Sequence, residues 1–175
     1  MTWAIRSAAL GDRDSILAVV RDAFSTDGQD GHEELEVVRE TWERSAVAEG
    51  LELVAVDDGE VLGHVLGALG DLDGREVVGI APLAVAPARH RQGIGAALMT
   101  ELLDRADARG LPLVLLLGST DYYPRFGFEP ASSLGITYEP VGAGDPHFQV
   151  RRLARYDPSY TGSFSYCWEL PRGRG

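Results

Sequence analysis

The feature that most limits the fold is an apolar run that leads, through a basic patch, into a glycine-rich helix start. The run EVVGIAPLAV covers residues 76–85, and Pro82 within it cannot donate a ladder hydrogen bond. Two arginines and a histidine follow at 89–91, and the sequence QGIGAALM then opens a helical pattern over 92–109, with Gly110 as its stop. We therefore predict a long strand, bulged, splayed or at a sheet edge near residue 82, that feeds directly into a helix.

Hydrophobic periodicity and turn residues place the other elements. Apolar alternation or runs predict strands at 3–8, 51–56, 61–69, 113–117, 148–153 and 164–170. Helical spacing predicts a first helix through residues 16–24, a second over about 33–48 and a short one at 119–126, with loops at 25–31 and 129–147. This order is typical of a mixed α/β domain, and 175 residues are enough for a single domain, 1–175, with its own core.

Charge and composition exclude several classes of function. The net charge of −11 gives a surface that repels phosphate backbones, so we expect no nucleic-acid partner, whereas a cationic substrate such as an amine would be tolerated. No window approaches the ~20 apolar residues that cross a membrane, and the first residues lack the pattern of a secretion signal. The single cysteine, Cys167, cannot form an intramolecular disulfide. We expect a cytoplasmic protein.

The glycines at the predicted helix start favour an anion-binding site. Backbone N–H groups in a first helical turn lack intrahelical partners, and Gly93 and Gly95 would let a bulky phosphate approach them closely. A Walker A loop is excluded, because no Gly-Lys-Ser/Thr follows. A dinucleotide fingerprint would need glycine or alanine at Leu98 and an acidic residue about 20 positions further on, and both are missing. A tight strand-to-helix turn without a ligand stays open as an alternative.

The stretch resembles the acetyl-CoA motif of the GNAT acyltransferase superfamily, Gln/Arg-x-x-Gly-x-Gly/Ala, with Gln92, Gly95 and Ala97 at its fixed positions. Members often carry a tyrosine four residues before a Gly-Phe pair, and Tyr123 stands at that spacing from Gly127. The segment YYPRFGF is similar to that of predicted bacterial acetyltransferases of the YhbS type. The resemblance covers residues 3–153 and leaves the segment after about residue 155 unassigned.

The resemblance implies a mixed central sheet flanked by helices, with a splayed strand at the site of acetyl-CoA, the co-substrate. Strand backbone groups at Leu83, Ala84 and Val85 would bind the pantetheine arm, and an N–H near Val85 could polarise the thioester carbonyl. Tyr123 would serve as the general acid near the sulfur. The pyrophosphate would be held by backbone groups of Arg91, Gln92, Gly93, Ile94, Gly95, Ala96 and Ala97.

The general base is not assigned by the pattern. Glu76 and His64 are the first candidates, and Glu33 and Glu34 on the second predicted helix are further ones. Many GNAT members carry an asparagine where this chain has Leu116, so a polar group near the thiol would have to come from residues 119–121. The histidines and Cys167 show no metal-ligand spacing, so no metal site is predicted.

These observations predict an acetyl-CoA-dependent N-acetyltransferase that moves an acetyl group to a primary amine by direct attack. The partner would be a small-molecule or peptide amine, with no nucleic acid and no membrane, and the resemblance also allows a homodimer. The alternatives are a non-catalytic acyl-CoA-binding regulatory module and a nucleotide-dependent oxidoreductase. The sequence does not identify the acceptor amine.

Overall fold

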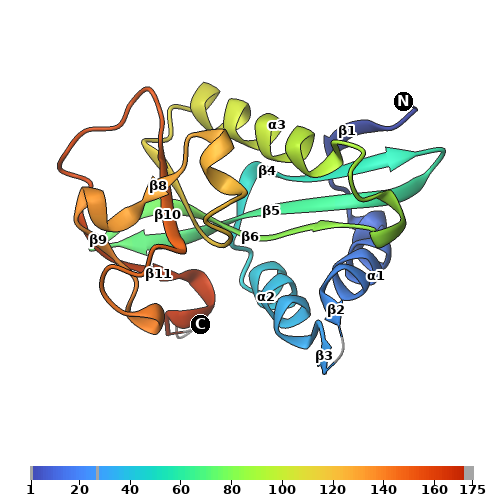
Figure 1. Ribbon diagram of the computed structural model, residues 1–175, viewed down its shortest axis with the longest axis horizontal. Coiled ribbons are helices and arrows are strands. Elements are labelled where there is room, and N and C mark those ends of the chain that lie inside the picture. The colour runs from blue at the N-terminus through green and yellow to red at the C-terminus, as the bar shows by residue number, and fades with distance from the viewer. Residues whose placement is uncertain (1, 27, 172–175) are drawn as a thin grey trace.

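The computed structural model describes residues 2–26 and 28–171 and is built on a mixed sheet in the order β1-β4-β5-β6-β7-β10-β8 (Figure 1). Its long central strands are antiparallel to one another, whereas β6 and β7 run parallel. The strands are β1 (Ala4–Ser7), β4 (Val47–Asp57), β5 (Glu60–Leu72), β6 (Arg75–Val85), β7 (Leu113–Leu117), β8 (Glu129–Pro130) and β10 (Phe148–Arg152). The mixed α/β architecture is the one that the sequence predicts.

Helices cover both faces of the sheet (Figure 1). Helix α3 (Ile94–Ala108) packs on one face, and α1 (Arg13–Phe24) and α2 (His32–Glu43) lie on the other. The apolar residues at helical spacing form the buried side of each helix. A hydrophobic core therefore lies on each face of the central strands, one beneath α3 and one beneath α1 and α2. The buried helix residues include Leu98, Met99 and Leu102 on one side and Ile16, Val20 and Val38 on the other.

The second helix is shorter than the sequence predicts. It ends at Glu43 rather than near residue 48, because Ser45 adopts a left-handed conformation with φ of 52° and turns the chain into β4. Gly50, expected to end the helix, lies instead at an irregularity of β4, where the register with β5 shifts between Val47 and Glu52. The predicted loop at 25–31 contains two short paired strands, β2 (Ser25–Thr26) and β3 (Gln29–Asp30).

The C-terminal part returns to the sheet. Strand β11 (Gly162–Tyr166) pairs antiparallel with the far end of β5 and parallel with β9 (Ile136–Thr137). The predicted strand at 164–170 therefore ends early, and a 3₁₀ turn at Cys167–Glu169 replaces its second half. The predicted helix at 119–126 is likewise a 3₁₀ turn, Tyr123–Phe126. No helix in the described ranges is both long and apolar enough to cross a membrane.

Strand β6 separates from β7 at the proline. The two strands pair only from Val78 to Ile80, opposite Val114 to Leu116, although β6 continues to Val85. At the same point the register between β6 and β5 shifts, because two residues of β6, Ala81 and Pro82, have no partner in the ladder. The predicted splayed strand is thus confirmed, and its last residues leave one backbone edge free of β7.

Candidate functional site

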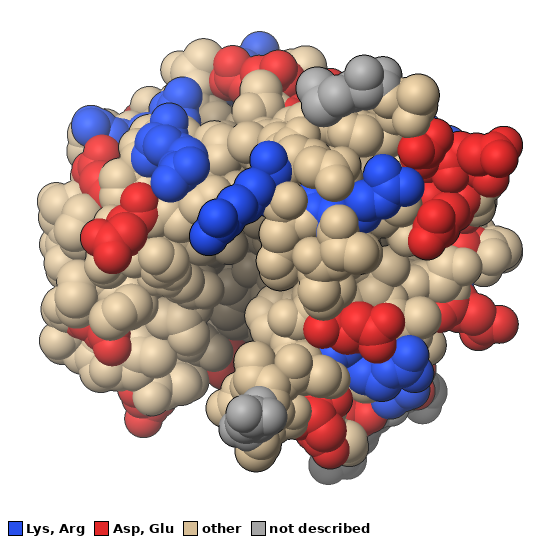
Figure 2. Space-filling model, turned by 45° about the vertical axis from the view of Figure 1, so that its right-hand side comes forward, with Lys and Arg blue, Asp and Glu red and all other residues tan. Residues whose placement is uncertain are grey.

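Two cavities meet where β6 leaves β7. One, of about 550 Å³, lies at the start of α3, and the other, of about 570 Å³, lies between the splayed strands and α2. Both are lined by Phe24, Leu83, Tyr122 and Tyr123, so they form one continuous groove. Figure 2 shows a hollow in the molecular surface, with arginine side chains above it and acidic side chains around its lower end.

The first cavity is built around the N-terminus of α3. Arg91 and Gly93 both have left-handed backbones, with φ of 62° and 81°, and they turn the chain so that the helix begins at Ile94. The N–H of Ala97 is the first to bond within the helix, to the carbonyl of Gly93 at 3.0 Å. The N–H groups before it have no intrahelical acceptor. These free N–H groups are what the predicted anion cradle requires, but Ala97 cannot contribute to it because its N–H is already bonded to Gly93.

Positive charge surrounds this helix start. Arg89, Arg91, Arg125 and His90 line the cavity, and no acidic residue of the described chain does. Arg89 also lies 3.6 Å from Asp57, and His90 hydrogen-bonds through Nε2 to the carbonyl of Val85 at 3.0 Å. In a chain of net charge −11, this concentration of cations at a helix N-terminus suits a polyphosphate. Gln92 lies outside the cavity lining.

The free edge of β6 borders both cavities. The N–H of Ala86 bonds to Leu62 on β5, and because the direction of backbone groups alternates along a strand, Leu83 and Val85 direct theirs away from β5. These two residues line the groove. Ala84, predicted to join them, has its backbone toward β5 and its side chain in the core beneath α1, so it does not face the groove.

Tyr123 stands at the junction of the two cavities. Its ring packs edge-on against Tyr122 and Phe128, with centroids 5.1 and 6.0 Å away. Burial, reinforced by the neighbouring Tyr122, raises the pKa of Tyr123 to about 12, so the phenol is protonated at neutral pH. A Cβ at Gly118 would collide with this ring, which explains the glycine at the end of β7. Sequence reasoning did not single out Gly118, because the clash exists only in three dimensions.

Tyr122 faces the helix start. A Cβ placed on Gly95 would lie 3.1 Å from its hydroxyl, and the Arg125 guanidinium lies 4.5 Å from its ring centroid. Burial raises the pKa of Tyr122, and Arg125 opposes that shift. Tyr122 therefore lines the groove.

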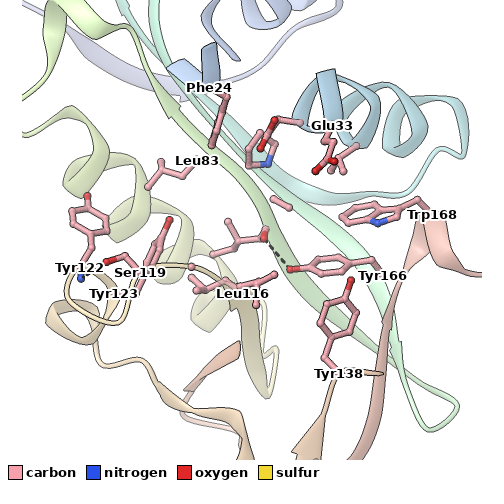
Figure 3. Close-up of a pocket in the computed structure, with 17 residues that line it drawn as sticks. Phe24, Glu33, Leu83, Leu116, Ser119, Tyr122, Tyr123, Tyr138, Tyr166 and Trp168 are labelled. Atoms are coloured by element: carbon pink, nitrogen blue, oxygen red, sulfur yellow. Dashed lines mark hydrogen bonds between the residues drawn. The ribbon is translucent and has the colours of Figure 1, made fainter. Parts of the chain in front are cut away.

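Segments that are distant in sequence form the second cavity (Figure 3). Figure 3 shows Glu33 and Trp168 on one side and Tyr122, Tyr123 and Ser119 on the other. The Tyr166 hydroxyl donates a hydrogen bond of 3.1 Å to the carbonyl of Ile80, where β6 leaves β7. The remaining lining residues come from the splayed strands, α2 and the C-terminal part: Glu34, Val37, Ala81, Pro82, Leu116, Leu117, Gly118 and Tyr138.

The two first candidates for a base do not reach this groove. His64 is 0% exposed and lies on the side of β5 that faces α1 and α2, where its Nε2 contacts Glu52 Oε1 at 2.9 Å. Glu76 is exposed near the opposite end of β6, about 13 Å along the strand from Ile80 at ~3.3 Å per residue. Neither residue lines the groove, whereas Glu33 and Glu34 line the second cavity.

The structure also places Leu116, the polar residues of 119–121 and Cys167, which were considered from the sequence. Leu116 lines the second cavity and presents an apolar side chain, and Ser119 is the polar residue of 119–121 that lies beside it. Cys167 is buried against Thr41, with 3.9 Å between sulfur and oxygen. Within residues 2–26 and 28–171, no group of three or more histidine, cysteine or acidic side chains could hold a metal ion.

The sequence profile of the acetyltransferase (GNAT) family matches residues 15–128, which include the helix start and Tyr123. The chain belongs to this family. It is 36% identical over 146 residues to the uncharacterized N-acetyltransferase YhbS of Escherichia coli, covering 82% of this chain and 83% of that protein. This GNAT chain therefore resembles that relative over most of its length.

Solved structures agree with this assignment. The crystal structure of E. coli YhbS in complex with CoA superimposes with a TM-score of 0.83 at 34% identity, covering 95% of this chain and 90% of that one. A GNAT acetyltransferase from Brucella melitensis in complex with acetyl-CoA gives a TM-score of 0.78 at 29% identity, covering 96% and 98%. The predicted GNAT fold is confirmed.

Proposed function

We propose that this protein is an acetyl-CoA-dependent N-acetyltransferase that acetylates a primary amine by direct attack. The observation that carries the proposal is the continuity of the groove: a cationic helix start and an apolar acceptor cavity meet at Tyr123 and the free edge of β6. Membership of the GNAT family and the CoA and acetyl-CoA complexes of its relatives support this assignment.

The proposed cofactor position follows the groove. The pyrophosphate would accept hydrogen bonds from the N–H groups at the start of α3, with Arg91 and Arg125 supplying positive charge. The pantetheine arm would pair with Leu83 and Val85 like an added strand, because their backbone groups face away from β5. The thioester would then lie beside Tyr123, at the entrance of the second cavity.

The proposed reaction is a single acyl transfer. The neutral amine attacks the thioester carbonyl, forming the new C–N bond, and the β6 backbone N–H polarises the carbonyl oxygen. The C–S bond breaks, and the departing thiolate takes the proton of the Tyr123 hydroxyl. The attacking nitrogen loses one proton to solvent, and solvent returns one proton to the Tyr123 phenolate, so the products are an amide and CoA with the phenol restored. His64 and Glu76 take no part in this scheme.

The proposal is tested by CoA release with acetyl-CoA and a panel of primary amines, using the wild type and Tyr123→Phe. We expect turnover by the wild type and a loss of at least tenfold in kcat for the variant, with CoA affinity retained. Tight CoA binding without turnover of any amine would instead support the non-catalytic binding module. Binding of NADH in place of CoA would support the oxidoreductase.

A further inference from the structure

The two halves of the groove carry opposite charge. The half at the start of α3 is lined by Arg89, Arg91 and Arg125, whereas the half beneath α2 is lined by Glu33 and Glu34. No arginine or histidine of the described residues lines this second half, and the chain contains no lysine. The charge thus reverses along one groove, and the acidic half is the one left for the acceptor.

The two glutamates are available to a ligand. No hydrogen bond or ion pair to either carboxylate is found within residues 2–26 and 28–171, whereas Glu36 on the same helix contacts Arg39 at 3.0 Å. Glu33 is exposed at the cavity rim, and Glu34 is half-buried. Both lie in the first turn of α2, where the helix dipole stabilises a carboxylate without a partner.

An apolar surface separates these carboxylates from Tyr123. Trp168 stacks on Tyr166 with ring centroids 4.2 Å apart and planes 11° apart, and Figure 3 shows Trp168 on the same side of the cavity as Glu33. Figure 3 shows Leu116 between Tyr166 and Tyr123, and Ile80, whose carbonyl accepts the Tyr166 hydrogen bond, also lines the cavity. A hydrocarbon chain would bury its surface here, and the charged side chains among the described lining residues are those of Glu33 and Glu34 on α2.

The aromatic wall is fixed in place. The Arg44 guanidinium donates to the carbonyls of Cys167 and Leu170 at 2.9 Å each, which ties the C-terminal turn to α2. Glu169 accepts hydrogen bonds from the Tyr138 hydroxyl at 2.6 Å and from the backbone N–H of Tyr166 at 2.7 Å. These hydrogen bonds therefore hold the aromatic wall in position without a substrate.

We propose that the acceptor is an aliphatic diamine: one amine attacks the thioester beside Tyr123, the hydrocarbon spacer crosses the apolar wall, and the second ammonium binds between Glu33 and Glu34. This inference rests on the proposed function and narrows its substrate. It also excludes acceptors that carry a carboxylate at the far end, because that group would be repelled by Glu33 and Glu34 in a partly desolvated site.

The test uses three acceptors with matched chains: 1,5-diaminopentane, 1-aminopentane, which lacks the second amine, and L-lysine, which adds a carboxylate. We expect kcat/KM for the diamine to exceed that of each of the other two at least tenfold, and a series of diamines of four to eight carbons would locate the best spacer. Equal kcat/KM for the three compounds would overturn the proposal.

The double variant Glu33→Gln, Glu34→Gln tests whether these two carboxylates of α2 cause the preference for a diamine over a monoamine. We expect it to reduce the ratio of diamine to monoamine kcat/KM at least tenfold through KM, while Glu36→Gln, outside the cavity, preserves the ratio. An unchanged ratio in the double variant, or an equal fall in kcat for all amines, would contradict recognition by these carboxylates.

Calorimetric binding of the same amines to CoA-saturated protein separates this inference from the proposed function. Preferential diamine binding without turnover would refute the enzyme and support the acceptor site. Turnover of amines without any preference would support the enzyme and refute the acceptor site.

Discussion

Valine at position 95 would place bulk inside the groove without straining the backbone. Gly95 is the second residue of α3 and has no left-handed φ, so its backbone accepts an L-residue. A Cβ there would already lie 3.1 Å from the Tyr122 hydroxyl and 3.5 Å from Val85 Cγ2. The two γ-methyl groups of valine must therefore extend into the cavity that the pyrophosphate would occupy.

The expected loss of affinity follows from the contacts displaced. One N–H-to-phosphate hydrogen bond contributes about 1.5–3 kcal/mol because its acceptor is charged. Losing one such bond raises Kd about ten- to hundredfold, at 1.4 kcal/mol for each factor of ten. The free energy of unfolding of the ligand-free protein should change by less than ~0.5 kcal/mol, because valine is no worse than glycine in a helix.

The assay is calorimetric titration of CoA into the wild type and Gly95→Val, together with thermal unfolding of both ligand-free proteins. Gly11→Val is the matched control, because a Cβ at Gly11 would have no atom within 4 Å and this residue lies outside the groove. Gly93→Ala differs in stability: the φ of 81° at this position costs a side chain about 1 kcal/mol, so we expect a lower free energy of unfolding for this variant. Unchanged CoA affinity in folded Gly95→Val would refute the cradle.

Three further changes test the groove. Because the pKa of Tyr123 is raised to about 12, its phenol stays protonated from about pH 7 to 10. We therefore expect the ratio of the wild-type kcat to the Tyr123→Phe kcat to be constant over that range. A decline of this ratio would contradict the role of Tyr123 as the general acid. Gly118→Ala should displace the Tyr123 ring and lower kcat at least tenfold in steady-state kinetics. An unaltered kcat would contradict this packing of Gly118 against the ring. Arg44→Ala removes the hydrogen bonds that hold the C-terminal turn. We expect a higher KM for the amine and a free energy of unfolding lower by about 1–3 kcal/mol in denaturant unfolding. Arg39→Ala is the control variant. A rise in the Kd for CoA rather than in the amine KM would contradict this role for Arg44.

The cofactor half of the groove could be predicted because its elements are contiguous in sequence. Pro82 cannot donate to a ladder, glycine at position 93 permits the left-handed turn, and the helix start follows within a few residues. Local rules of backbone geometry therefore predicted the splayed strand and the free N–H groups. They did not predict that Ala84 faces away, because this depends on the register between β5 and β6.

The acceptor half could not be predicted, because no local pattern connects its parts. His64 and Glu76 were wrong as candidates since burial and position along a strand are set by the sheet and by the helices packed on it. Tyr166 and Trp168 reach the cavity only because β11 pairs with β5 across about 90 residues of chain, at Phe164 and Leu72. The sequence by itself determined the mixed fold and the glycine-rich helix start with its free N–H groups, through short-range backbone constraints. Only the tertiary structure decided which carboxylates and aromatic rings line the second cavity, because long-range strand pairing and packing bring those side chains together.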